Sequence, residues 1–169
     1  MRRHVVALFI VLGCLVAGAA QAEQVRFPKT GATAFVINLV PGWVTHEDQY
    51  NGIQVLAPDR RTLLYLSMVQ DEKYKDKPMM ELALAIGKPS NITEFPKQEP
   101  TSVSGKPGQA FYGQMKNASG TLLDVKMVII PIGPALWATE TILSSKGIDA
   151  AQSKALKQAV SGVTLANGP

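Results

Sequence analysis

The sequence predicts the α+β class, with an antiparallel β-sheet layered with helices. Short segments with alternating or continuous apolar residues recur along the chain and are separated by turn residues, as in antiparallel strands. Two other segments place apolar residues every three to four positions, as in amphipathic helices. The chain has 169 residues, and the 147 that follow the first 22 are enough for one hydrophobic core and too few for two ordinary domains.

The first 22 residues have the features of a secretory signal peptide. Arg2 and Arg3 provide a positive start, residues 5–16 form an apolar run, and an A-x-A cleavage site ends at Ala22. We expect cleavage after Ala22, a single folded domain over residues 23–169, and a periplasmic or secreted location. The apolar run is shorter than the roughly 20 residues that a membrane-spanning helix needs.

A lipid anchor is an alternative to cleavage at this site. Residues 11–14, Val-Leu-Gly-Cys, resemble a bacterial lipobox, in which Cys14 would become the acylated first residue. The apolar run continues past Cys14, and the A-x-A site follows it. These two features favour cleavage after Ala22.

The chain without its first 22 residues offers few groups for familiar chemistry. It has 147 residues, no cysteine and one histidine, His46, and its net charge is +2 instead of +4 because Arg2 and Arg3 are removed. A serine or cysteine hydrolase relay needs an imidazole base, and no G-x-S-x-G motif accompanies His46. Nucleic-acid binding would need a strong, clustered basic excess. We expect no enzyme, no cofactor and no nucleic-acid partner.

In the N-terminal half of the domain, the residue pattern predicts four extended segments. Residues 34–40 alternate apolar side chains and form a strand that ends at a Pro-Gly turn, after which residues 43–44 restart an extended segment. Residues 53–57 and 63–70 form a second pair of strands. Because the segment 63–70 is apolar on both faces, we expect it in the middle of the sheet beneath a helix.

The middle of the chain predicts one helix and an irregular stretch. Residues 71–77 form a charged loop before an amphipathic helix that begins near Pro78 and ends at Gly87. Its apolar stripe consists of Met79, Leu82, Ala83 and Ile86. The proline-rich stretch 89–107 predicts an extended excursion with at most a short edge strand at 101–104.

The C-terminal half predicts a meander and a closing helix. Strands at 109–116 and 121–130 are joined by a four-residue loop, and a last strand at 136–143 follows a turn at 131–134. The closing helix runs from 148 to 160. The residues that we expect in the core are Phe35, Leu39, Leu64, Leu66, Ile129, Trp137 and Leu156.

Several landmarks follow one another along the chain: a strand with a Pro-Gly-Trp end at 36–43, Asn-Gly-Ile at 51–53, a helix after the third strand, Val-Ser-Gly-Lys-Pro-Gly at 103–108, the meander and the closing helix. This order resembles the PsbP-like fold family, which includes the photosystem II extrinsic protein PsbP, a Ran-binding nuclear-import factor and bacterial DcrB-like secreted proteins. The resemblance implies an α/β/α sandwich and binding or accessory roles at membrane-associated assemblies. No functional residue of the family has a matching motif in this sequence.

Two polar loops hold the candidate binding residues, and we expect these loops on one rim of the sheet. The residues are His46, Glu47, Asp48, Tyr50, Arg60 and Arg61. The first loop combines an imidazole, two carboxylates and an aromatic ring, while the arginines offer planar donors for a carboxylate or phosphate. Ordinary solvated turns are the simpler interpretation of both. Because adjacent residues seldom converge on one ion and no second histidine or cysteine follows, we expect no metal here.

Three weaker patterns complete the candidates. The alternating lysines of residues 73–77 suit anionic lipid or an acidic partner, although nearby acidic residues make a solvated loop the simpler interpretation. Trp43 and Trp137 suit a ligand platform, although we expect both in the core. A carboxylate pair would serve sugar chemistry, but the sequence cannot place two carboxylates across a cleft. The possible members are Glu47, Asp48, Asp71, Glu72, Glu99 and Glu140.

Together these features predict an exported, periplasmic, non-catalytic binding or accessory protein of the bacterial envelope. We expect a monomer whose partner is an envelope protein or a small ligand, and the lysines of residues 73–77 are compatible with peripheral membrane association. The alternatives are a lipid-anchored envelope component attached through Cys14 and an enzyme with a carboxylate-based site that the sequence does not identify.

Overall fold

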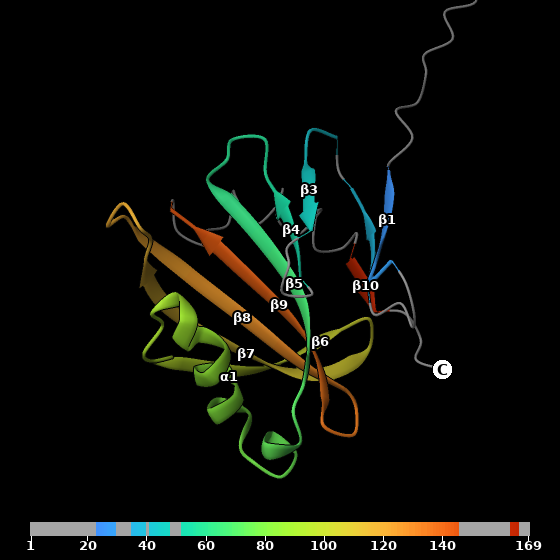
Figure 1. Cartoon of the computed structure of the whole chain (residues 1–169), viewed down its shortest axis with the longest axis vertical. Coiled ribbons are helices and arrows are strands. Elements are labelled where there is room, and N and C mark those ends of the chain that lie inside the picture. The colour runs from blue at the N-terminus through green and yellow to red at the C-terminus, as the bar shows by residue number, and fades with distance from the viewer. Residues whose placement is uncertain (1–22, 30–34, 40, 48–51, 146–162, 166–169) are drawn as a thin grey trace, which may run out of the picture.

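In the part of the chain that the structure describes, two antiparallel sheets form, and an α-helix covers part of the larger one (Figure 1). The structure is a computed structural model that describes residues 23–29, 35–39, 41–47, 52–145 and 163–165. Within these ranges, a seven-stranded sheet has the order β3-β4-β5-β9-β8-β7-β6, and a three-stranded sheet has the order β1-β2-β10. The α+β class and the antiparallel sheet with a helix on it are as the sequence predicts.

The element bounds follow the turn residues of the sequence closely. The small sheet contains β1 (Gln24–Phe27), β2 (Phe35–Asn38) and β10 (Val163–Leu165). The large sheet contains β3 (Val44–Glu47), β4 (Gly52–Leu56), β5 (Thr62–Gln70), β6 (Lys97–Val103), β7 (Lys106–Lys116), β8 (Leu122–Gly133) and β9 (Leu136–Ser144). The helical elements in the described ranges are η1 (Glu72–Tyr74), α1 (Met79–Gly87) and η2 (Lys88–Ser90).

The strand β5 lies inside the large sheet between β4 and β9, as its apolar pattern predicts. It pairs with β9 along its full length, from Thr62 opposite Ser144 to Gln70 opposite Leu136. The helix α1, however, packs over β7 and β8, and β5 joins the apolar cluster beneath α1 through Val69. The helix is therefore displaced across the sheet from its predicted place above β5.

Two apolar clusters form the core, one on each face of the large sheet. The first lies between the two sheets and joins Phe35 of β2 to Leu64 of β5. The second lies beneath α1 and joins Leu82 to Phe111 of β7. Six predicted core residues are confirmed as buried, namely Phe35, Leu39, Leu64, Leu66, Ile129 and Trp137. The seventh, Leu156, lies outside the described residues.

Two elements differ from the prediction. The strand β6 extends over Lys97–Val103 and pairs with β7 throughout, whereas the sequence predicted a short strand at 101–104. Because an edge strand has a ladder on one side only, it tolerates Pro100 in its middle. Pro131 lies within β8 rather than in a turn, and the strand continues through an irregularity between Pro131 and Gly133.

Several predictions fall on residues that the structure does not describe. These are the signal peptide at 1–22, the lipobox cysteine Cys14 and the closing helix at 148–160. None of the helices within the described ranges is long and apolar enough to cross a membrane.

Candidate functional site

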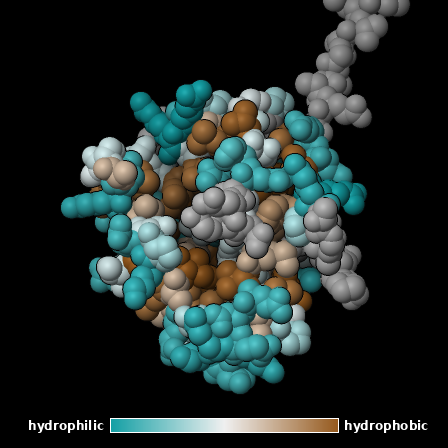
Figure 2. Space-filling model, viewed as in Figure 1, coloured by the Kyte–Doolittle hydropathy of each residue, from teal (hydrophilic) through white to brown (hydrophobic). Residues whose placement is uncertain are grey.

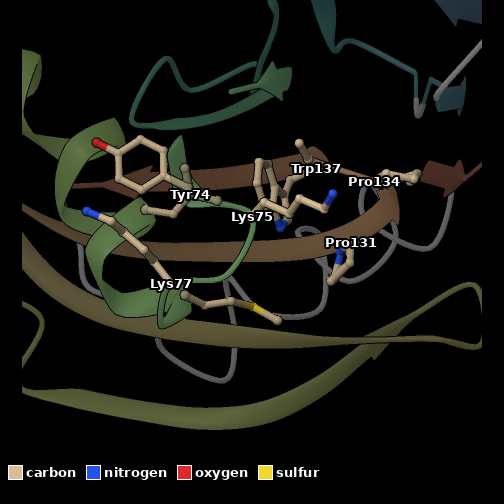
Figure 3. Close-up of a pocket in the computed structure, with 10 residues that line it drawn as sticks. Tyr74, Lys75, Lys77, Pro131, Pro134 and Trp137 are labelled. Atoms are coloured by element: carbon tan, nitrogen blue, oxygen red, sulfur yellow. The ribbon is translucent and has the colours of Figure 1, made fainter. Parts of the chain in front are cut away.

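A pocket of about 240 Å³ opens between the loop after β5 and the turn that joins β8 to β9. We call it the Trp137 pocket. Its lining residues are Tyr74, Lys75, Lys77, Met79, Leu82, Pro131, Gly133, Pro134, Ala135 and Trp137. Figure 3 shows Tyr74 and Lys77 on one side of the pocket, Pro131 and Pro134 on the other, and Lys75 with Trp137 between them.

Strand pairing brings these two distant segments together. Gln70 at the end of β5 lies opposite Leu136 at the start of β9, so the residues after β5 and before β9 meet at the same end of the sheet. The backbone N–H of Asp71 donates to the carbonyl of Ala135 at 3.1 Å and ties the two segments to each other. This end forms the bottom of the molecule in Figure 1, and Figure 2 shows hydrophilic residues there beside exposed apolar ones.

The short helix η1 is formed by the residues around Asp71. The Asp71 carboxylate accepts a hydrogen bond from the backbone N–H of Lys73 at 3.1 Å and caps the turn. The same carboxylate forms an ion pair of 2.8 Å with the Lys73 ammonium. The hydrogen bond with this ammonium lowers the pKa of Asp71 and raises the pKa of Lys73. The predicted charged loop is therefore an ordered turn, which presents Tyr74 and Lys75 to the pocket.

The opposite wall is built from residues whose conformations are restricted. Pro131 lies opposite Trp137 in the β8–β9 ladder, and the turn between these strands contains Pro134 and Ala135. Ala135 has a positive φ of 51°. Trp137 is 6% exposed and belongs to the apolar cluster beneath α1, so the cluster holds its ring in place. Trp137 is thus both a core residue, as predicted, and a wall of the pocket.

The three lysines of this loop differ in their charge partners. Lys73 pairs with Asp71, and Lys77, which precedes α1, pairs at 3.2 Å with Glu81 in the first turn of that helix. Both ammonium groups also lie near the Tyr74 ring, at 4.7 Å and 5.8 Å from its centre. For Lys75, by contrast, no ion pair is formed with any residue in the described part of the chain. Lys75 therefore leaves a positive charge at the pocket without a paired carboxylate there.

The lining of the Trp137 pocket combines apolar surface with positive charge. Its polar side chains are two ammonium groups, a phenol and an indole, and none of the ten residues is an acid, a histidine, a serine or a cysteine. An apolar floor beside a cation that forms no ion pair within the described residues favours a ligand that carries an apolar part and a negative charge.

The structure does not bring the two predicted binding loops together on one rim. His46 and Glu47 lie in the edge strand β3, next to the end of β4 that begins at Gly52. Arg60 and Arg61 follow the other end of β4, after Leu56. A strand of five residues separates them by about 13 Å, at 3.3 Å per residue. The expectation of a single rim was therefore wrong, because β4 runs directly between the two loops.

The local contacts of these residues are those of a surface. His46 and Glu47 are exposed, and Glu47 forms an ion pair of 2.9 Å with Lys29. Arg60 and Arg61 are exposed in the turn between β4 and β5, where the Asp59 carboxylate accepts from the Arg61 backbone N–H at 2.9 Å. Asp48 and Tyr50 lie outside the described residues. A binding role for this set stays a prediction.

Within the described ranges, no three His, Cys, Asp or Glu side chains gather closely enough to hold a metal ion. The one strongly perturbed carboxyl group there is Glu140, in the middle of β9. Its side chain is 2% exposed, and burial raises its pKa to about 7. Glu140 lies opposite Leu66 and Val128 in the ladder, so it shares the face that packs between the two sheets and does not reach the Trp137 pocket.

A second polar group lies further along the same face of the large sheet. The Tyr112 hydroxyl donates to the Glu99 carboxylate, and burial together with this hydrogen bond raises the pKa of Tyr112 to about 12. Lys97 pairs with Glu99 at 3.0 Å and lies 4.5 Å from the centre of the Tyr112 ring. Lys126, which also faces this ring at 5.7 Å, acts on Glu140 and lowers its pKa, against the larger effect of burial. The positive charges of the lysines in this group therefore offset the negative charges of its acids.

Sequence reasoning missed the Trp137 pocket because its parts are about sixty positions apart. Residues 73–77 alone have the pattern of a solvated loop, and Trp137 alone has the pattern of a core residue. Pairing of strand 63–70 with strand 136–143 would have indicated that residues 73–77 lie near Trp137. When two antiparallel strands pair, the end of one strand lies beside the start of the other. The burial of Glu140 could have been predicted from its position between Ala138 and Ile142 on one apolar face of strand 136–143.

Comparison with solved structures places this architecture among known folds. Cyanobacterial PsbP from Synechocystis sp. PCC 6803 superposes with a TM-score of 0.56 at 10% identity, over 92% of this chain and 99% of that one. LpqN of Mycobacterium tuberculosis, described as involved in cell envelope biogenesis, gives a TM-score of 0.51 at 16% identity, over 88% of this chain and 91% of that one. The chain has a PsbP-like fold.

A protein from Bacteroides thetaiotaomicron VPI-5482 is also similar, with a TM-score of 0.57 at 14% identity over 86% of this chain. The match covers 49% of that protein, so this chain spans about half of its length. No protein-family model matches the sequence, and no curated protein matches it either. The similarity to cyanobacterial PsbP and to LpqN confirms the PsbP-like fold that the order of elements along the sequence indicates.

Proposed function

We propose that the chain is an exported, non-catalytic accessory protein of the bacterial envelope, and that it holds its partner at the Trp137 pocket. The observation that supports this most strongly is the composition of that pocket. Lys75 carries a positive charge without a paired carboxylate in the described residues, beside the buried ring of Trp137. Binding sites commonly combine apolar walls with a small number of placed polar groups.

The envelope location is supported by two independent features. The first 22 residues have the pattern of a secretory signal peptide. LpqN, which shares the PsbP-like fold, is described as involved in cell envelope biogenesis. Cleavage after Ala22 would release the protein into the periplasm, whereas acylation at Cys14 would leave the same domain attached to a membrane.

An accessory role is favoured over an enzymatic one by where the perturbed carboxyl group lies. Glu140 has the raised pKa that is typical of a catalytic acid, but it is buried between the sheets and absent from the pocket lining. A catalytic site needs the perturbed group and the cavity in one place. Here they lie on opposite faces of the large sheet.

Affinity capture from the native envelope tests this proposal. Wild-type protein, Lys75→Glu and the control Lys116→Glu are each used as bait, since Lys116 is exposed at the end of β7 and does not line the pocket. We expect one species to be retained by the wild type and the control and lost with Lys75→Glu, and its purified form to bind again. Equal recovery by all three baits would contradict the assignment of this pocket.

The arginines of the β4–β5 turn provide the competing surface in the same experiment. Reversing the charges of Arg60 and Arg61 together should leave both capture and thermal stability unchanged, because both side chains are exposed and precede β5, whereas the pocket lies beyond the other end of this nine-residue strand. If this double variant loses the captured species while Lys75→Glu keeps it, the binding surface is the turn and the pocket proposal is wrong.

A further inference from the structure

The size of the Trp137 pocket restricts what can occupy it. Small-molecule and cofactor sites generally enclose about 300–1,000 Å³ and bury most of their ligand. The Trp137 pocket is smaller, about 240 Å³, and it opens at the surface between a loop and a turn (Figure 3). It is large enough for one bulky side chain, and it would leave most of an ordinary cofactor outside.

Its walls have the composition of a contact point between proteins. The indole of Trp137, the phenol of Tyr74 and the thioether of Met79 belong to the residue types that are enriched at the centres of protein interfaces. Pro131 and Pro134 add rigid apolar surface on the facing side. Because the wall residues are held by the β8–β9 ladder and by the cluster beneath α1, little ordering entropy is lost when a side chain enters.

The charge at the pocket mouth is positive and local. The lining contains Lys75 and Lys77 and no carboxylate, and Lys77 already pairs with Glu81. The acids Glu72 and Asp76 lie in the same loop but do not line the pocket. Recognition of an anionic membrane generally uses clusters of four to eight cations. At the pocket, Lys75 alone is without an ion pair among the described residues, which favours one carboxylate of a partner over a lipid surface.

We propose that the Trp137 pocket receives one apolar side chain from an acidic segment of a partner protein, and that a carboxylate beside this side chain pairs with Lys75. The proposal rests on the accessory function proposed above and specifies the partner's chemistry. The apolar side chain packs on Trp137 and the prolines, and the neighbouring carboxylate supplies the charge that the described residues do not give to Lys75.

Peptide titrations observed by NMR test this directly. The exported protein is labelled with ¹⁵N and titrated with three blocked peptides, Asp-Phe-Asp, Asn-Phe-Asn and Asp-Ala-Asp. We expect millimolar Asp-Phe-Asp to shift the indole resonance of Trp137 and the amides of residues 74–77 and 133–137. The two other peptides should bind at least about tenfold more weakly. Asn-Phe-Asn lacks the carboxylate that pairs with Lys75, and Asp-Ala-Asp lacks the large apolar side chain that fills the pocket.

Charge variants supply the matched controls. Lys75→Glu should weaken Asp-Phe-Asp binding about tenfold and remove most of its salt dependence, while Lys116→Glu should leave both within about twofold of the wild type. Neither change affects a buried residue, so the spectra of the free variants should match the wild-type spectrum outside the substituted site.

Several results would overturn the proposal. They are the absence of any shift at Trp137 with Asp-Phe-Asp, equal binding of Asn-Phe-Asn, or Lys75-dependent binding of benzoate or of phosphatidylglycerol vesicles in preference to the peptide. If the peptide fails while Lys75→Glu still loses the species captured from the envelope, the accessory function stands and only the partner's chemistry is wrong.

Discussion

Replacing Glu140 with glutamine should remove this residue's contribution to the dependence of stability on pH between about pH 4.5 and pH 7. Burial raises the pKa of this carboxyl group from 4.5 to about 7 in the folded protein. Because the folded state holds this proton more tightly than the unfolded state, the contribution of Glu140 to stability is greatest below about pH 4.5, is lost as the pH rises through 7, and then levels off. The isosteric amide carries no charge at any of these values.

The magnitude follows from the two pKa values. Each pKa unit corresponds to 1.36 kcal/mol, so ionising Glu140 inside the folded protein costs about 3 kcal/mol at pH 8. Lys126 acts in the opposite direction and offsets part of the effect of burial. We therefore expect the glutamine variant to be as stable as the wild type near pH 4 and more stable by up to about 3 kcal/mol near pH 8.

Urea denaturation of the two proteins across this pH range is the assay, with Glu94→Gln as the control. Glu94 is exposed in the segment between η2 and β6, so its substitution should leave the pH profile of the wild type in place. Parallel profiles of the wild type and Glu140→Gln would refute the argument, as would a variant that is less stable near pH 8. Either result would mean that the folded protein stabilises the ionised carboxylate.

The other predictions concern the core, a close backbone contact and export. Truncating the fully buried Leu66 to alanine should lower the free energy of unfolding by about 2–5 kcal/mol, and an unchanged urea midpoint would show that β5 is not central. A Cβ at Gly113 would lie 2.7 Å from the Glu94 carbonyl oxygen, so Gly113→Ala should cost about 1–3 kcal/mol in the same assay; wild-type stability would mean that this backbone can move aside. Intact-mass measurement of the exported protein should give a chain that begins directly after Ala22, whereas a chain that begins at an acylated Cys14 would support the lipid anchor.

The sequence predicted the sheet well because its strands follow simple periodic patterns. The segment 63–70 is apolar on both faces, and it became the fully paired interior strand β5. Phe35 and Leu39 lie on one face of the alternating segment 34–40, Ile129 lies in the apolar strand 121–130, and all three are buried as predicted. The order of strands and turns along the chain was enough to indicate the PsbP-like fold. That order can be predicted because each strand and turn has a local residue pattern.

Two kinds of feature were beyond such patterns. The length of β6 was underestimated because Pro100 normally interrupts a strand, and only its place at the sheet edge makes it compatible with pairing. The placement of α1 over β7 and β8 depends on tertiary packing that the helix's own apolar stripe does not specify.

The candidate site was less predictable than the fold because it depends on contacts between distant segments. Lys75 and Trp137 become neighbours only when β5 pairs with β9 in the observed register. The same geometry separates His46 from Arg60, since β4 lies between their loops. Residue types alone favoured the loops of His46 and Arg60 because they contain more kinds of polar side chain. Strand pairing instead places Lys75 beside Trp137 at the end of β5.

The most direct test of the Trp137 pocket as the binding site is photo-crosslinking in the native cell. A photoreactive amino acid replaces Met79, which lines the pocket, or as a control Lys116, which does not. We predict one covalent adduct with a partner protein from position 79, its loss when Lys75→Glu is added, and no such adduct from position 116. A binding role for the Trp137 pocket would be contradicted if position 79 gave no adduct, or if the same adducts formed from both positions whether residue 75 is lysine or glutamate.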